Sequence, residues 1–153
     1  MKQFSRVLFL SLFLLFHLAC SEDSNEAVVI DVIEAYQALD VSYGPDPNQT
    51  FDIYLPANRT NMTKTIILVH GGSWIAGDKT DMDRFKSYIL QFHPNIGVIN
   101  MNYTLADATT PPIPLQTNDI SAVVNYISEN KSSLILSDDI GFIGASAGAH
   151  LSL

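Results

Sequence analysis

The second half of the chain alternates between short apolar runs and amphipathic stretches. Thr65–Val69 and Ile140–Gly144 are continuous apolar and β-branched runs, typical of strands buried on both faces of a parallel sheet. Between them, apolar residues recur at spacings of three and four in 81–92 and in 115–130, which predicts two helices. Ile96–Tyr103 is a further predicted strand. This order predicts an α/β fold with parallel βαβ units.

The apolar positions of each predicted element indicate the side that faces the sheet. In the two helices they are Met82, Phe85, Ile89 and Phe92, and Ile120, Val123, Val124 and Ile127. Upstream, Phe51, Ile53 and Leu55 alternate with polar residues and share one face of a half-buried strand. Residues 40–50 are dense in turn formers, and 28–39 fits either a short helix or a strand.

The first residues are a targeting segment and not part of the fold. Lys2 and Arg6 flank the start of an apolar run, Val7–Leu18, which is too short to span a bilayer but has the length of a signal-peptide core. We therefore assign 1–19 to a signal peptide, 20–40 to a polar tether and lead-in, and 41–153 to the folded domain. The protein is expected to be exported.

Cys20 is the only cysteine of the chain and directly follows Ala19. Its setting resembles the lipobox of bacterial lipoproteins, although His17 stands where Leu is usual. Lipidation of Cys20 would place the protein at the outer membrane or the cell surface. The alternative is an ordinary secretory signal, which would make the protein periplasmic or secreted.

Composition and charge narrow the range of partners. Apolar residues make up 47% of the chain and charged residues 16%, which suits one globular domain. The net charge of −8 repels phosphate backbones, so nucleic acid is excluded as a partner. Contact with a membrane is expected only through a lipid anchor at Cys20.

Gly144-Ala145-Ser146-Ala147-Gly148 matches the G-x-S-x-G pattern of a nucleophile elbow. A serine hydroxyl becomes a useful nucleophile when a sharp strand-to-helix turn holds it clear of its own backbone. A Cβ at Gly144 or Gly148 would crowd that turn. A buried strand is predicted before the motif and a helix after it, so we expect Ser146 to be the nucleophile. The alternative is a small-residue turn that only packs tightly.

A second motif, His70-Gly71-Gly72-Ser73-Trp74, follows another predicted strand. Glycines at a strand end let backbone N–H groups turn toward a substrate carbonyl, as an oxyanion hole requires. We expect the N–H groups of Gly72, Ser73 and Ala147 to be the donors. A glycine-rich turn without a ligand is the alternative.

These motifs resemble the branch of the α/β-hydrolase superfamily that contains HGG-motif carboxylesterases and lipases, including feruloyl and acetyl esterases. The resemblance covers 41–153 and includes HGGSW with the trailing Gly77-Asp78-Lys79. It implies the N-terminal part of an α/β-hydrolase sheet, mostly parallel with helices on both faces, truncated just after the nucleophile elbow. It also implies a small-molecule ester substrate and an acyl-enzyme, with no metal and no organic cofactor. One departure is Ser73, where many members have a third glycine.

In this superfamily the acid and the histidine of the triad follow the serine, and only seven residues follow Ser146. We therefore expect both to lie beyond residue 153 and this piece alone to be inactive. His150 lies four residues into the next helix, on its flank, and is expected to be structural. His70 is expected to hold the oxyanion turn by loop hydrogen bonds, and His93 to end a surface helix.

Three carboxylates precede the serine: Asp119, Asp138 and Asp139. We expect them to serve helix capping and loop solvation. Trp74 could line the substrate pocket or anchor the core, and the sequence does not separate these roles.

The sequence thus predicts a serine hydrolase of small acyl or aryl esters. Two alternatives stay open: an amide-cleaving, formamidase-like relative, and a non-catalytic surface lipoprotein that binds ligands on the same scaffold. A third possibility is that the chain is the product of a broken gene.

Overall fold

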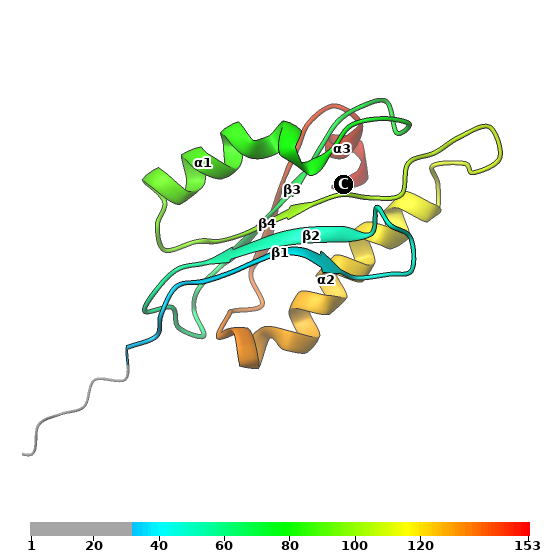
Figure 1. Ribbon diagram of the computed structural model, residues 1–153. Coiled ribbons are helices and arrows are strands. Elements are labelled where there is room, and N and C mark those ends of the chain that lie inside the picture. The colour runs from blue at the N-terminus through cyan, green and yellow to red at the C-terminus, as the bar shows by residue number, and fades with distance from the viewer. Residues whose placement is uncertain (1–31) are drawn as a thin grey trace, which may run out of the picture. The chain divides into compact units, whose positions relative to one another are not determined.

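The computed structural model describes residues 32–153 (Figure 1). The predicted signal peptide and Cys20 lie outside the described residues. The strands are β1 (Tyr36–Ser42), β2 (Thr50–Leu55), β3 (Thr65–Val69), β4 (Gly97–Met101) and β5 (Ile140–Gly144). The helices are α1 (Asp83–Phe92), α2 (Leu115–Leu134) and α3 (Ala147–Leu151), and a 3-10 turn, η1 (Lys79–Met82), precedes α1.

The strands form one mixed sheet in the order β1-β2-β4-β3-β5. β1 with β2 and β2 with β4 pair antiparallel, whereas β3 lies parallel to both β4 and β5, as the alternating pattern predicts. Val69 at the end of β3 is in register with Met101 on one side and Gly144 on the other. The parallel strands therefore end at one edge of the sheet, and the two glycine motifs emerge beside each other there.

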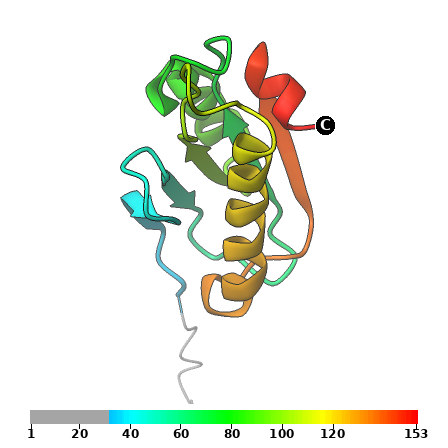
Figure 2. The same cartoon turned by 90° about the vertical axis from the view of Figure 1, so that its right-hand side faces the viewer.

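Helices cover both faces of the sheet (Figures 1 and 2). On one face, Ile120, Val123 and Ile127 of α2 pack with Leu151 of α3 in the larger core cluster. On the other face, Ile89 of α1 packs in a smaller cluster with residues of η1, β3 and β4. The helix pattern of 115–130 is thus confirmed, and α2 continues to Leu134.

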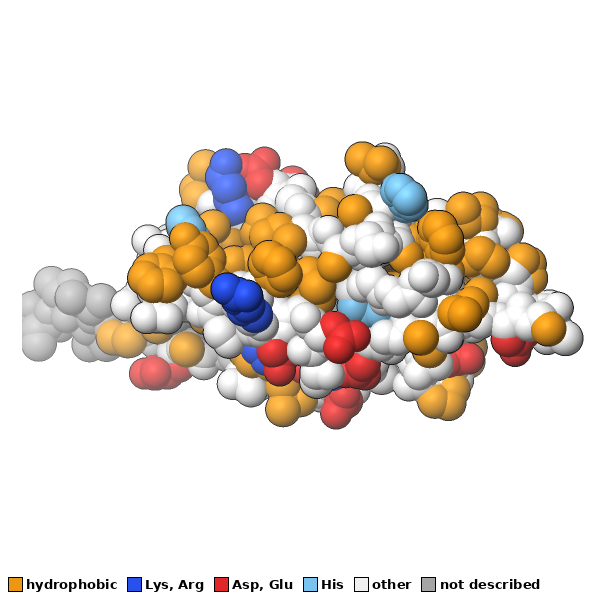
Figure 3. Space-filling model, turned by 90° about the horizontal axis from the view of Figure 1, so that it is seen from above, with side chains coloured by type: hydrophobic (Ala, Val, Ile, Leu, Met, Phe, Trp, Pro, Cys, Tyr) orange, Lys and Arg blue, Asp and Glu red, His pale blue; other side chains and the backbone are white. Residues whose placement is uncertain are grey.

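The helix pattern of 81–92 is only half right about which side is buried. Met82 and Ile89 are buried, but Phe85 and Phe92 are 47% and 57% exposed. Hydrophobic side chains gather on the face that carries α1 (Figure 3). Phe85 and Phe92 line a groove there with Ile143 of β5.

Two strands differ from the sequence expectation. β1 runs from Tyr36 to Ser42. It therefore includes the end of the predicted lead-in, 20–40, and the start of the predicted turn region, 40–50. β5 has the predicted bounds, but all five of its residues are partly exposed because it is an edge strand of the described sheet. Within residues 32–153, no helix combines the length and the apolar character needed to cross a membrane.

Candidate active site

Ser146 stands at a tight turn between β5 and α3. Its backbone has φ 49° and ψ −113°, a sparsely populated conformation for a residue with a Cβ, and the residue is exposed. The turn is closed by the N–H groups of Gly148, which donates to Ala145 O at 2.8 Å, and of Ala149, which donates to Ser146 O at 3.0 Å. A strained, exposed serine between a strand and a helix has the geometry of a nucleophile elbow.

The flanking glycines of the motif are required by space. A Cβ on Gly144 would lie 2.5 Å from the backbone of Gly148 and Ala149. A Cβ on Gly148 would lie 2.3 Å from Val69 O and 2.4 Å from His70 O. The crowding expected from the sequence is therefore present, and α3 packs against the end of β3 through bare backbone.

The loop after β3 adopts a turn with positive φ angles, which glycine favours but the following serine and tryptophan do not. Gly72 has φ 115°, and a Cβ there would lie 1.9 Å from Ala76 O. Ser73 and Trp74 follow with φ 53° and 69°, in the region that side chains rarely adopt. Gly72 O accepts the N–H groups of Ile75 at 3.1 Å and Ala76 at 3.0 Å, which closes the turn.

The two motifs lie against each other. A Cβ built on Gly71 would be 3.4 Å from the Cβ of Ser146 and 2.9 Å from Ala145 O. Within residues 32–153, the N–H groups of Gly72, Ser73 and Ala147 donate to no protein acceptor. The structure thus places unpaired backbone donors on the two segments that meet at Ser146, as an oxyanion hole requires.

His70 supports this loop through a hydrogen bond and a ring stack. It is buried, its Nδ1 donates to Gly71 O at 2.7 Å, and its ring stacks on Tyr103 with centroids 4.2 Å apart. Burial lowers the pKa of His70, and the Gly71 carbonyl offsets this only in part, so the ring is neutral at neutral pH. The Tyr103 hydroxyl, whose pKa burial raises to about 12, donates to His70 O at 3.1 Å.

Trp74 and His150 form an aromatic pair beside the site. Their rings stack with centroids 5.9 Å apart, and Trp74 also packs against the larger core cluster. His150 lies on the exposed flank of α3, and no hydrogen bond joins its ring to Ser146 among the described residues. These contacts fit the structural role expected for His150 and favour Trp74 as a packing anchor.

Two buried polar residues hold the loop through partners that the sequence does not indicate. Gln116 of α2 donates from Nε2 to Trp74 O at 2.7 Å and to Thr104 O at 2.8 Å. Lys79, at the far end of the loop, pairs through Nζ with Asp40 of β1 and Asp52 of β2. Lys79 belongs to the Gly77-Asp78-Lys79 segment noted in the sequence. The sequence does not indicate that Asp40 and Asp52 are its partners.

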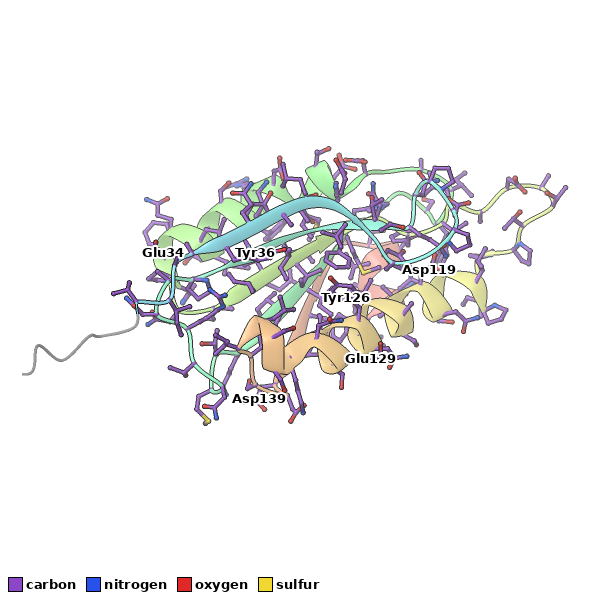
Figure 4. All side chains as sticks on the ribbon, turned by 60° about the horizontal axis from the view of Figure 1, so that its bottom comes forward. Glu34, Tyr36, Asp119, Tyr126, Glu129 and Asp139 are labelled. Carbon is purple, nitrogen blue, oxygen red and sulfur yellow. The ribbon has the colours of Figure 1, made fainter. Side chains whose placement is uncertain are left out.

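The expected capping role of Asp119 is wrong. Asp119 is buried inside α2, where it accepts Thr104 N–H at 2.8 Å and Gln49 Nε2 at 2.7 Å. Figure 4 shows it where the β1–β2 hairpin approaches α2. The exposed Asp138 and Asp139 pair with Lys131 and Lys64 at the surface. His93 ends α1 and is exposed, as predicted.

With this geometry established, comparison with known proteins identifies the family. The family model BD-FAE matches residues 51–153, which include both motifs, β3, β4, β5 and all but the first residue of β2. The chain belongs to the BD-FAE family. Its fold is that of α/β-hydrolase esterases, of which the described residues are one part.

Relatives of this BD-FAE chain are esterases by name. It is 28% identical over 116 residues to a probable isoprenylcysteine alpha-carbonyl methylesterase of Arabidopsis thaliana, covering 76% of this chain and 24% of that protein. It is 29% identical over 117 residues to an acetyl esterase of Salmonella typhi, covering 76% and 34%. The solved structure of esterase B from Lactobacillus rhamnosis matches with 28% identity and a TM-score of 0.61, covering 77% and 38%. The chain thus spans a quarter to a third of the length of these curated relatives.

Proposed function

We propose that the full-length protein is a carboxylesterase in which Ser146 is the nucleophile. The observation that carries the proposal is the strained, exposed Ser146 directly beside the glycine loop, the turn after β3 that contains Gly71, Gly72 and Gly77. Family membership supports ester hydrolysis as the general chemistry. Because relatives are named for acetyl and methyl esters, we propose small acyl or aryl esters as the substrate class.

The proposed reaction proceeds in two halves. The Ser146 Oγ attacks the carbonyl carbon of the ester, and the carbonyl oxygen gains the negative charge. The N–H groups of Gly72, Ser73 and Ala147 stabilise this oxyanion, and its collapse expels the alcohol and leaves an acyl-serine. Water then attacks the acyl-serine in the same site and releases the acid. The N-terminal end of α3 adds a favourable dipole at the oxyanion.

A base must take the Ser146 proton during each half. Within residues 32–153, no histidine or carboxylate is hydrogen-bonded to the Ser146 side chain. We therefore propose that the base and the acid that orients it come from further sequence of the full-length protein. The greater length of the relatives supports this assignment.

Turnover of p-nitrophenyl acetate by the full-length protein tests the proposal. Ser146→Ala should lower kcat by about 10⁴-fold or more, because nucleophile and base act as one unit. Ser121→Ala is the matched control, since Ser121 is exposed on α2 and bonds only Thr117 O. Equal turnover by Ser146→Ala and the wild type would refute Ser146 as nucleophile. An N-formyl aromatic amine tested in parallel separates an esterase from an amide-cleaving relative, and no turnover of either would favour a binding protein.

The export of the protein is also proposed. The sequence around Cys20 supports a lipoprotein signal, and radiolabelled palmitate fed to an expressing Gram-negative host tests it. Label on the wild type but not on Cys20→Ala would support lipidation, whereas secretion of an unlabelled protein would contradict it.

A further inference from the structure

The peptide group after Trp74 is held from outside the glycine loop. Gln116 is fully buried, and both hydrogens of its Nε2 are used, one on Trp74 O at 2.7 Å and the other on Thr104 O at 2.8 Å. The N–H of Ala106 also donates to Trp74 O, at 2.9 Å. One carbonyl in a left-handed part of the loop therefore accepts two donors, from α2 and from the segment after β4.

This carbonyl is linked to the proposed oxyanion donor through two peptide groups. Trp74 C=O and Ile75 N–H belong to the same peptide, and Ile75 N–H donates to Gly72 O at 3.1 Å. Gly72 C=O and Ser73 N–H in turn belong to one peptide. Because peptide groups are planar, fixing Trp74 C=O orients the next plane and, through Gly72 C=O, the direction of Ser73 N–H. Hydrogen bonds in such a series also polarise one another.

We propose that Gln116 is a positioning residue that aims Ser73 N–H at the oxyanion through this series. The inference rests on the proposed function, since it matters only where Ser73 N–H meets a developing negative charge. The loop needs such support because Ser73 and Trp74 have φ of 53° and 69°, and strained backbone persists only where its surroundings fix it. The Gln116 amide supplies two donors that an apolar side chain of the same length lacks.

Three variants of the full-length protein test the role of Gln116. Gln116→Met keeps the length of the side chain but loses both donors. Gln116→Glu puts a carboxylate against two carbonyl oxygens, and only its protonated form can donate to one of them. Gln49→Met is the matched control, because Gln49 donates to buried Asp119 at 2.7 Å and has no bond to the glycine loop. Each variant is titrated with a fluorophosphonate, so that rates are expressed per active serine.

We expect Gln116→Met to lower kcat for p-nitrophenyl acetate about 10- to 100-fold, somewhat less than removal of an oxyanion donor, with KM little changed. Affinity for an aryl trifluoromethyl ketone, which forms a tetrahedral oxyanion on the serine, should weaken by the same factor as kcat/KM. Gln116→Glu should regain activity relative to the wild type as the pH falls and its side chain is protonated. Gln49→Met should keep its kcat per active serine while losing stability.

A purely structural role would give a different pattern. Gln116→Met would then lower the melting temperature and the fraction of active serine, while kcat per active serine and ketone affinity stayed at wild-type values, which would overturn the proposal. A rise in KM alone would also overturn it. Should Gln116→Met fail to fold, the pH profile of Gln116→Glu decides, because a profile parallel to that of the wild type contradicts the proposal. Failure of the proposed function is recognised separately, by wild-type turnover in Ser146→Ala.

Discussion

Gly148 contacts Val69 through backbone alone. A Cβ on Gly148 would lie 2.3 Å from the carbonyl oxygen of Val69, and that oxygen already accepts the Ala145 N–H at 3.0 Å. The first turn of α3 and the last residue of β3 are therefore as close as bare backbone allows. This contact brings the nucleophile elbow onto the strand that leads into the glycine loop.

Gly148→Ala should disrupt this contact. The clashing atoms belong to the backbone, so neither segment can move without shifting Ser146, and we expect a loss of about 3 kcal/mol or more in the free energy of unfolding. Gly141→Ala is the control, since its Cβ would meet only the end of the Ile66 side chain, at 3.0 Å. Denaturant unfolding of the full-length variants measures the difference. Equal losses in both would contradict the close contact.

The backbone strain at Ser146 should lower the stability of the folded protein. Ser146→Gly removes the Cβ from a backbone with φ 49° and should raise the free energy of unfolding by about 1–2 kcal/mol. Ser146→Ala keeps the Cβ and should change stability much less. Both should be inactive as esterases. Thermal and denaturant unfolding of the two variants, side by side, checks this order, and a less stable Ser146→Gly would argue against strain.

Lys79 should stabilise the end of the glycine loop. Its buried ammonium pairs with Asp52, which is also buried, so Lys79→Met leaves this carboxylate with the Asp40 N–H but without a positive charge and should cost roughly 3 kcal/mol. Adding Asp52→Asn should restore part of that loss. The double variant compared with both single variants gives the coupling, and a coupling near zero would contradict the pairing.

The pH dependence of this ion pair follows from the pKa of Lys79. Burial lowers this pKa, but the hydrogen bonds to Asp40 and Asp52 outweigh burial and raise it above its usual value. The folded state therefore holds this proton more tightly than the unfolded state. The contribution is complete below about pH 10.4 and is lost as the pH rises through the raised pKa.

His70 predicts a second, opposite pH dependence. Its pKa is lowered mainly by burial, which Gly71 O and the charges of Asp81 and Asp78 partly offset. The His70 side chain therefore binds a proton near about pH 6.5 in the unfolded state but only at lower pH in the folded state. The free energy of unfolding should fall as the pH drops below about 6.5. His70→Asn keeps a donor toward Gly71 O but does not titrate. Unfolding at about pH 7.5 and about pH 5 should show a smaller loss for His70→Asn, and equal losses would contradict the prediction.

The sequence predicted the elements that carry the site because their signals are local. Thr65–Val69 and Ile140–Gly144 have the predicted bounds, since short continuous apolar runs that lead into glycine-rich turns leave few alternatives. The need for glycine in both motifs could also be predicted, because each turn that requires glycine is formed by residues within a few positions of it. The functional roles of Ser146, Gly72, Ser73 and Ala147 stay predictions, and the variants above address those of Ser146 and Ser73.

What the sequence did not predict depends on distant partners. Gln116 reads as an ordinary polar residue near a helix start, and only the fold brings it to Trp74, 42 positions earlier. The sequence suggests capping for Asp119 because its actual partners, partly buried Gln49 and buried Thr104, lie on other segments. Phe85 fits the helical period but is exposed. Periodicity indicates which side of the helix is apolar, but not how wide the buried part of that side is.

The site of covalent labelling in the full-length protein shows directly whether Ser146 is the nucleophile. A fluorophosphonate should add one phosphonyl group, peptide mapping should place it on Ser146, and loss of p-nitrophenyl acetate turnover should follow labelling in proportion. Ser146→Ala should carry no adduct. An adduct at another residue, or full turnover after Ser146 is labelled, would contradict Ser146 as the nucleophile.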